Sequence, residues 1–413
     1  MAIAEAALEA IDTGAAIRRT VAVESAALRV AGGSLALPPG GRLRLAAVGK
    51  CASAAAAALA DVLGARLTDG IALDVDEAPR VAVPRVRTLY GTHPLPSEAN
   101  VEATRAILRF LDGGRAADVV LCVISGGGST LLCLPPPGAS IAAERAAVEA
   151  LTRAGATIAE INTVRKHSSL ARGGLLAMAA RPARVEGLIF SDVPGGASDL
   201  VASGPTLLDP TTVADAERVL ARYGVPAPGE PFRLPLIETP KDPADFALVR
   251  DTVVVSNALA LDAMAAAARG LGLAARVRTA TLSGEAREVA ASIARDLDAA
   301  PAGTALLYGG ETTVTVRGAG HGGRNLELAL AALGAVRSDA LVLTLASDGR
   351  DNGDLAGAIA DAVTRDAARR AGADPADFLA ANDSYGFFAR VPHALETGPT
   401  GANVADLIVA LRP

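Results

Sequence analysis

Short apolar runs alternate with amphipathic or alanine-rich stretches along most of the chain. The apolar runs predict strands, and several are continuous, which is typical of strands buried on both faces. The stretches between them, such as 258–272 and 325–336, predict helices. The predicted strands cover residues 44–49, 70–75, 86–92, 118–125, 186–193, 252–257, 275–281, 304–310, 313–318 and 341–348. This alternation predicts an α/β fold with mainly parallel sheets between layers of helices.

The chain has 413 residues, a length typical of two or three domains. Residues 223–246 are rich in proline and charge, which makes them the best candidate for a linker. We therefore expect an N-terminal domain over residues 1–240 and a C-terminal domain over residues 241–413.

Two of the predicted strands are close neighbours in the sequence. Only Glu311 and Thr312 separate the runs 304–310 and 313–318. This spacing predicts a hairpin or a sharp bend in an antiparallel pair. The C-terminal domain is therefore expected to contain a mixed sheet.

Composition and charge exclude several classes of protein. The formal net charge is −6 with no basic block, so we expect no nucleic-acid partner. Cys51, Cys122 and Cys133 form no CxxC pair, which argues against zinc and disulfides and for a reducing compartment. The N-terminus reads as an amphipathic helix and no apolar run is long enough for a bilayer, so a cytoplasmic protein without a membrane partner is expected.

Polar and glycine residues collect where the predicted strands end, and open α/β sheets bind ligands at those ends. Lys50 follows the strand 44–49 and precedes a helix, where a cation meets a phosphate or carboxylate beside the helix amides. The alternative is a surface lysine at a turn.

A glycine run follows the strand 118–125. Three successive glycines let backbone N–H groups approach an anion closely, and the alternative is a flexible turn. No G-K-[ST] follows, so the run is not a Walker A motif. The predicted anion-binding loop consists of Ser125, Gly126, Gly127, Gly128 and Ser129.

Two further segments carry candidate charges. Lys166 and His167 follow Arg165 in one short stretch, for which a solvated helix start and a structural histidine are the more common interpretations. Asp192 ends the strand 186–193, where a catalytic carboxylate and a turn cap are about equally expected.

The richest cluster lies at 309–325. Four glycines in six residues precede a helix that begins with Arg324 and Asn325, which is the pattern of a phosphate cradle with an arginine fork. Gly322 and Gly323 are the glycines nearest that helix, and Glu311 follows the strand 304–310.

An acidic turn follows the strand 341–348. Asp348 and Asp351 are candidate ligands for Mg²⁺, which prefers hard oxygen ligands. An ordinary acidic turn is the alternative, and the loop lacks the terminal glutamate of an EF-hand.

Taken together, these segments resemble the glycerate 2-kinase family, whose members combine a Rossmann-like N-terminal domain with a C-terminal MOFRL domain. The resemblance is colinear through most of the chain. It is carried by GK at 49–50, GTHPLPSEAN at 91–100, ISGGGSTLL at 124–132, INTVRKHSS at 161–169, SDVPGGASDLVASGPT at 191–206, YGGETTVTVRGAGHGGRNLELAL at 308–330, ASDGRDNGDLAGA at 346–358 and TGPTGANVADL at 397–407. The sequence departs from the usual pattern of the family at 172–176, at His321 and in the acidic turn after Asp348.

The resemblance implies a fold, a reaction and a set of site residues. It implies an α/β/α N-terminal sandwich, an active site in the cleft between the domains, ATP and Mg²⁺ as co-substrates, and D-glycerate as the acceptor that becomes 2-phosphoglycerate. Lys50 and Arg324 then carry phosphoryl charge, Asp192 serves as base or orienting group, and Asp348 and Asp351 bind Mg²⁺. The implied substrate-binding and phosphate-binding set is Ser125, Gly126, Gly127, Gly128, Ser129, Lys166, Asn257, Glu311, Gly322, Gly323 and Asn325. A homodimer is also considered.

Three alternatives remain open. Members of the family have been labelled hydroxypyruvate reductases, but no GxGxxG follows a strand with an acidic residue about twenty positions later. A kinase acting on another small hydroxy acid would use the same residues. A non-catalytic binding or scaffold protein would not need the charged residues at the strand ends.

Overall fold

The computed structural model describes residues 1–193, 195, 200–225 and 234–413, and it divides into two compact units. The N-terminal unit comprises residues 16–191 and 197–254, and the C-terminal unit comprises residues 1–15, 192–196 and 255–413. The main change of unit thus falls between residues 254 and 255, whereas the sequence placed it near residue 240. Part of the expected linker, residues 226–233, lies outside the described residues.

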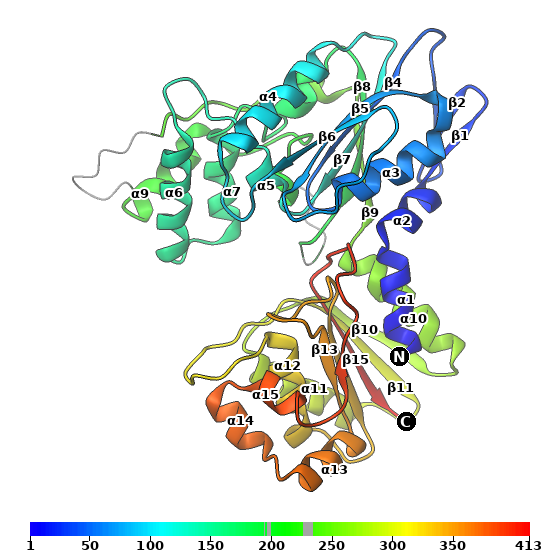
Figure 1. Ribbon diagram of the computed structural model, residues 1–413, viewed down its shortest axis with the longest axis vertical. Coiled ribbons are helices and arrows are strands. Elements are labelled where there is room, and N and C mark those ends of the chain that lie inside the picture. Colours follow the sequence, from blue (N-terminus) through cyan, green and yellow to red (C-terminus); the bar gives the residue numbers. More distant parts are fainter. Residues whose placement is uncertain (194, 196–199, 226–233) are drawn as a thin grey trace. The chain divides into compact units, whose positions relative to one another are not determined.

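The N-terminal unit is built on a six-stranded sheet in the order β6-β5-β4-β7-β8-β9 (Figure 1). The pairs β4–β5, β5–β6, β4–β7 and β7–β8 are all parallel, as predicted. The central strands β4 and β7 are buried along their whole length, which explains why their sequences are apolar except for Arg44 in β4 and Ser125 at the end of β7. The strands are β4 (Leu43–Val48), β5 (Leu67–Val75), β6 (Val86–Gly91), β7 (Val119–Ser125), β8 (Arg184–Phe190) and β9 (Val249–Val255).

Helices cover this sheet on both sides. The β4–α3–β5 and β6–α4–β7 crossovers run in opposite directions across the sheet, so right-handed connections put α3 and α4 on opposite faces. The helices α6, α7 and α9 form a separate small cluster with its own apolar core (Figure 1). The helical elements are α3 (Ala52–Leu63), η1 (Gly64–Arg66), α4 (Glu98–Asp112), α5 (Gly128–Leu131), α6 (Ile141–Arg153), α7 (Ile158–His167), α8 (Leu175–Ala179), η3 (Val201–Ser203), α9 (Val213–Arg222) and η4 (Pro243–Phe246).

A small antiparallel sheet precedes the main one and was not predicted. It consists of β1 (Val21–Glu24), β2 (Ala27–Val30) and β3 (Gly33–Ala36). The expected N-terminal helix is interrupted at Asp12, so it forms α1 (Ala2–Ile11) and α2 (Thr13–Thr20). The extended backbone of Asp12, at φ −52° and ψ 125°, breaks the helix there.

The C-terminal unit contains the expected mixed sheet, in the order β10-β11-β15-β12-β13-β14. The strands β10 and β11 are parallel, and every other neighbouring pair is antiparallel. The strands are β10 (Ala274–Leu282), β11 (Thr304–Gly310), β12 (Leu341–Ala346), β13 (Gly357–Ala360), β14 (Ala394–Leu395) and β15 (Asp406–Arg412).

The predicted hairpin between 304–310 and 313–318 is wrong. Residues 313–318 form no strand, and β11 pairs instead with β10 and β15. The chain leaves β11 at Glu311, whose N–H donates to Leu282 O of β10, and Thr313 forms a single bridge to Glu285. The sheet is mixed because the C-terminal strand β15 runs antiparallel between β11 and β12.

Both faces of the C-terminal sheet are covered. Leu306, Tyr308 and Ile408 point into a core shared with α11, α12, α13 and α15. Alternate residues such as Leu307 and Val409 face the other side, where α1 and α10 pack together (Figure 1). The helices are α10 (Asn257–Gly270), α11 (Ala286–Ala299), α12 (Arg324–Ala335), α13 (Ala362–Ala371), α14 (Pro375–Ala381) and α15 (Ser384–Phe388). Among the described residues, no helix is long and apolar enough to cross a membrane.

Candidate active site

The ends of β4 and β7 touch closely, and this contact positions the first candidate residues. A Cβ atom on Gly49 would lie 2.0 Å from Ser125 Oγ, and Gly49 has a φ of +120°, so only glycine fits there. The Ser125 hydroxyl donates to Val48 O at 3.2 Å and accepts from Cys51 N at 3.4 Å. Lys50 N donates to Gly126 O at 2.9 Å. The turn that carries Lys50 is therefore fastened to the predicted anion-binding loop.

The side chains of Lys50 and His93 flank that loop. A Cβ atom on Gly127 would lie 3.1 Å from Lys50 Cγ and 3.3 Å from His93 Cδ2. Lys50 is exposed, and within the described part of the chain it forms no ion pair. Burial, and then the positive charge of Lys50, lower the pKa of His93.

The loop also offers its own backbone donors. The N–H groups of residues 126–129 donate to no acceptor among the described residues. Gly127 has a φ of +80°, which turns the chain from β7 into the short helix α5. Successive free N–H groups in such a turn form a concave site for an anion. The predicted binding of an anion by the glycine run stays a prediction.

A strained segment supports the other side of the loop. Ala202, Ser203 and Gly204 all have φ between 51° and 60°, and left-handed backbone at non-glycine residues is uncommon. Ser203 Oγ lies 2.9 Å from Ser129 Oγ and donates to Asn162 Oδ1 at 2.8 Å. A Cβ atom on Gly128 would lie 2.5 Å from Ala202 Cβ. Glycine at position 128 is thus required by packing against Ala202.

Lys166 and His167 lie in a buried polar cluster. Lys166 Nζ is 3.2 Å from Asp209 Oδ1, and neither side chain is more than 5% exposed. His167 Nδ1 lies 2.8 Å from Ile237 O, and Thr211 donates to Asp209 with both its N–H and its hydroxyl. Burial alone would raise the pKa of Asp209, but Lys166 and the Thr211 hydrogen bonds outweigh it and lower that pKa. The Lys166 ammonium is therefore engaged within the protein.

Asp192 is half-buried and follows Ser191 after the end of β8. Asp192 belongs to the C-terminal unit, as does the rest of the segment 192–196. Its neighbours in the 191–206 motif, Pro194 and residues 196–199, lie outside the described residues. The predicted role of Asp192 as a base stays a prediction.

In the C-terminal unit, the glycines of the loop 318–323 are required by packing within the chain. A Cβ atom on Gly318 would lie 2.1 Å from Ala381 O, and one on Gly322 would lie 2.0 Å from Ser384 Oγ. A Cβ atom on Gly323 would lie 2.2 Å from Asp351 O. The glycine pattern thus has a structural cause that does not depend on a phosphate.

The helix start at Arg324 is occupied by acidic side chains. Arg324 donates from Nε and Nη2 to the two carboxylate oxygens of Asp406, at 2.6 and 3.1 Å, and Nη1 lies 2.8 Å from Glu311 Oε1. Burial alone would lower the pKa of Arg324, but Asp406 and then Glu311 raise it. Glu327, on the same helix as Arg324, pairs instead with Arg287 at 2.7 Å.

Asn257 and Asn325 are both buried structural links. Asn257 Nδ2 donates to Val404 O at 2.8 Å, and a Cβ atom on Gly309 would lie 2.0 Å from Asn257 Oδ1. Asn325 Nδ2 donates to Asp406 Oδ1 at 2.8 Å. These contacts hold α10 and α12 to the start of β15.

The two predicted Mg²⁺ ligands do not form an open metal site. Asp351 accepts the N–H groups of Asn325 and Leu326 at 3.0 and 2.7 Å, so its carboxylate caps α12. Asp348 Oδ1 accepts Arg350 N at 3.0 Å. Among the described residues, no group of three histidine, cysteine, aspartate or glutamate side chains is placed to hold a metal ion. Burial raises the pKa of Asp351, which also argues against a free anionic ligand.

Sequence reasoning passed over three residues of these clusters. His93 and Asp406 both lie within segments that carry the family resemblance, at 91–100 and 397–407, but neither was assigned a role. Arg165 was overlooked beside Lys166. A residue type and its spacing do not tell which of two adjacent cations is paired, so only the fold distinguishes Arg165 from Lys166.

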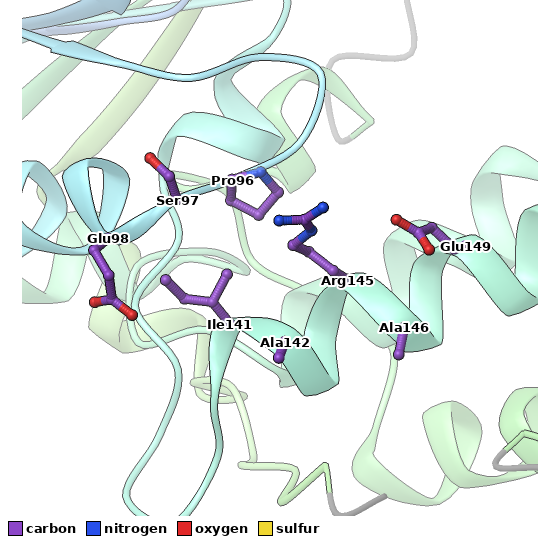
Figure 2. Close-up of a pocket in the computed structure, with 8 residues that line it drawn as sticks. All are labelled: Pro96, Ser97, Glu98, Ile141, Ala142, Arg145, Ala146 and Glu149. Atoms are coloured by element: carbon purple, nitrogen blue, oxygen red, sulfur yellow. The ribbon is translucent and has the colours of Figure 1, made fainter. Parts of the chain in front are cut away.

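One hollow of the N-terminal unit lies between the start of α4 and helix α6 (Figure 2). It has a volume of about 540 Å³ and is lined by Pro96, Ser97, Glu98, Ile141, Ala142, Arg145, Ala146 and Glu149. Arg145 extends from α6 toward Pro96 (Figure 2). None of the predicted site residues lines this hollow.

Comparison with known proteins defines the class and then the family. Residues 1–231 match the family described as "Domain of unknown function (DUF4147)", and residues 304–406 match the MOFRL family. The fold and these two matches define a two-domain α/β protein of the DUF4147–MOFRL type. The chain belongs to the glycerate 2-kinase family.

Most of the individual relatives carry the name of a glycerate kinase, and some carry another name. A D-glycerate 2-kinase of Thermotoga maritima is 38% identical over 331 residues, which cover 77% of this chain and 78% of the relative. The crystal structure of a glycerate kinase from Thermotoga maritima superposes with a TM-score of 0.88 at 35% identity, covering 100% of this chain and 98% of that chain. An Agrobacterium vitis relative, 40% identical over 345 residues, with 79% of this chain and 78% of the relative covered, is provisionally named a hydroxypyruvate reductase.

The Lys166–Asp209 pair yields a test of whether Lys166 is structural. Lys166→Met removes the cation nearest to the buried Asp209 carboxylate and leaves only the longer contact to Lys241 Nζ at 3.8 Å, so we expect the free energy of unfolding to fall by up to about 3–5 kcal/mol. Urea denaturation measures this change. The double variant Lys166→Met/Asp209→Asn should recover part of the loss, because it no longer contains an uncompensated charge. A fully stable Lys166→Met protein would contradict a structural role for Lys166.

Proposed function

We propose that this protein is an ATP-dependent glycerate 2-kinase. It transfers the γ-phosphoryl group to the 2-hydroxyl of D-glycerate: the new O–P bond forms as the bond from the γ-phosphorus to the departing ADP oxygen breaks. The single observation that carries the proposal is the family match over both domains together with kinases among the relatives. Lys50 and the N–H groups of residues 126–129, which have no partner among the described residues, support it.

Lys50 is our leading candidate for charge stabilisation. Phosphoryl transfer requires in-line positioning and neutralisation of charge on the transferred group more than covalent chemistry by the protein. Lys50 is exposed, unpaired among the described residues and fastened beside the loop by its own N–H. The loop amides add donors that need no reorganisation.

The proposal gives roles to two further residues. Asp192 accepts the proton of the 2-hydroxyl or orients that hydroxyl. Arg324 contributes charge to the phosphoryl group while its fork is held by Asp406 and Glu311. Two carboxylates already offset the charge of this guanidinium. We therefore expect its contribution to catalysis to come from the position of its N–H donors and not from net charge.

The Mg²⁺ ion that the reaction requires is best assigned to the phosphates of the nucleotide. Asp351 caps α12 and does not fit the role of a Mg²⁺ ligand. Mg²⁺ commonly keeps several waters and binds through substrate phosphates with one or two carboxylates. We therefore propose that Mg²⁺ enters with ATP, and we derive no step through a protein-bound metal.

The first experiment locates the phosphate on the product. We expect D-glycerate, ATP and Mg²⁺ to yield 2-phosphoglycerate, identified by ³¹P NMR with proton coupling. A parallel assay with hydroxypyruvate and NADH tests the reductase alternative. Exclusive formation of 3-phosphoglycerate, or NADH oxidation without phosphoryl transfer, would refute the proposed function.

The second experiment removes the free cation. Lys50→Ala should lower kcat/KM for D-glycerate by about 10²-fold or more, the scale seen when an electrostatic stabiliser is lost. Its stability should hardly change, because the exposed ammonium forms no ion pair within the described residues. Steady-state kinetics and thermal melting on the same preparation measure both. A fully active Lys50→Ala enzyme would show that Lys50 is an ordinary surface lysine at a turn.

The third experiment compares two arginines in matched surroundings. Arg324 and Arg287 are 33% and 36% exposed, and each contacts a carboxylate that is 3% or less exposed. Arg324→Lys and Arg287→Lys both lose fork geometry, so each should destabilise the protein by about 1–3 kcal/mol. Only Arg324→Lys should also reduce kcat, by about 10²-fold. Equal kcat values for the two variants would remove Arg324 from the catalytic machinery.

A further inference from the structure

Arg165 occupies a junction of four elements in the N-terminal unit. It lies in the last turn of α7 and lines a cavity of about 20 Å³ with Ser129 and Thr130 of the β7 loop. Pro94, from the segment after β6, and Val148 of α6 close the same cavity. A space of this size holds about one water molecule. Any larger ligand of Arg165 therefore has to lie outside the cavity.

Arg165 has no direct ion-pair partner among the described residues, unlike its neighbours, and Glu144 attracts it without contacting it. Lys166 pairs with Asp209 at 3.2 Å, and Arg172 pairs with Glu144 at 2.7 Å. The Arg165 guanidinium forms no ion pair or hydrogen bond within the part of the chain that the structure describes. Burial, and then repulsion from Arg172, lower the pKa of Arg165 to about 10, so it stays charged at neutral pH. A largely covered cation without a counter-ion is costly, and a bound anion would remove that cost.

The surroundings of Arg165 are suited to an anion. The positive charges of Lys50 and Arg165, and the negative charge of Glu77, all act on His93, whose ring lies beside Gly127. The free N–H groups of residues 126–129 belong to the turn at Gly127. The only acidic side chain that lines the cavity, Glu144, is already bound by Arg172.

We propose that Arg165 binds the carboxylate of the hydroxy-acid acceptor and so makes the enzyme selective for carboxylated acceptors. This inference rests on the proposed function and names the residue that recognises the acceptor. A guanidinium matches the planar carboxylate with two parallel N–H donors, whereas the single point charge of Lys50 suits the phosphoryl group. In D-glycerate the carboxylate is bonded to the carbon that bears the 2-hydroxyl. Holding the carboxylate therefore also presents that hydroxyl in preference to the one on the next carbon.

The test pairs a residue change with a ligand change. Arg165→Met should raise the KM for D-glycerate by about 10²-fold, while kcat falls only a few-fold and the calorimetric Kd for ADP is unchanged. D-glyceramide, which lacks the charged carboxylate, should be used equally poorly by the wild type and by Arg165→Met. Arg165→Lys should restore part of the affinity for D-glycerate. The matched control is Arg153→Met, at an exposed arginine on the neighbouring helix α6, which should leave all these constants unchanged.

The melting temperature of Arg165→Met distinguishes a role of Arg165 in substrate recognition from a structural role. Because Arg165 is unpaired and repelled by Arg172, Arg165→Met should melt at the same temperature as the wild type or slightly higher. An unchanged KM for D-glycerate in the folded variant would overturn the inference. A higher Kd for ADP with an unchanged KM for D-glycerate would also overturn it and assign Arg165 to the nucleotide phosphates. Should Arg165→Met melt well below the wild type, the role is structural and the inference fails. A wild-type enzyme that phosphorylates no hydroxy acid would instead refute the proposed function itself.

Discussion

The contact between the ends of β4 and β7 is the constraint on which the rest of the N-terminal site depends. Gly49 has no side chain, so the Ser125 hydroxyl reaches both Val48 O and Cys51 N. This fixes the Lys50 turn against the glycine run, and His93 then packs beside Gly127. Without that approach, the cation and the backbone donors would lie on two separate loops. One missing methyl group therefore determines whether the ends of two adjacent strands lie close enough to place the Lys50 turn beside these backbone donors.

The two glycine-rich loops of the chain show that the same sequence pattern has two physical causes. In the run 126–128, the turn leaves backbone N–H groups without acceptors among the described residues, as an anion-binding loop requires. In the loop 318–323, the glycines make room for the segment 381–385 and for Asp351. Asp351 also takes the helix amides that a phosphate would otherwise use. Glycine thus reports a close approach, and the fold decides which atom approaches.

The sequence predicted the buried parallel strands well, because an unbroken apolar run such as β7 records burial on both faces. It failed where the partner of a segment lies far along the chain. The central strand β15 was missed, so β11 was paired with the wrong neighbour. The same limit applies to the site: Lys50 was found from its place at a strand end, while the pairing of Lys166 with Asp209, 43 residues later, left no local signal.

The membership of α1 in the C-terminal unit has a consequence for biosynthesis. Ile3, Ala7 and Ile11 are buried in that unit, where α1 packs along α10. On the ribosome, α1 is made first, yet its partner at residues 257–270 follows only after the whole N-terminal unit. At roughly 5–20 residues per second, this apolar helix face waits on the order of ten to fifty seconds for its partner. The nascent chain therefore has to shield that face, or retain it without misdocking, while an entire unit folds between the two helices.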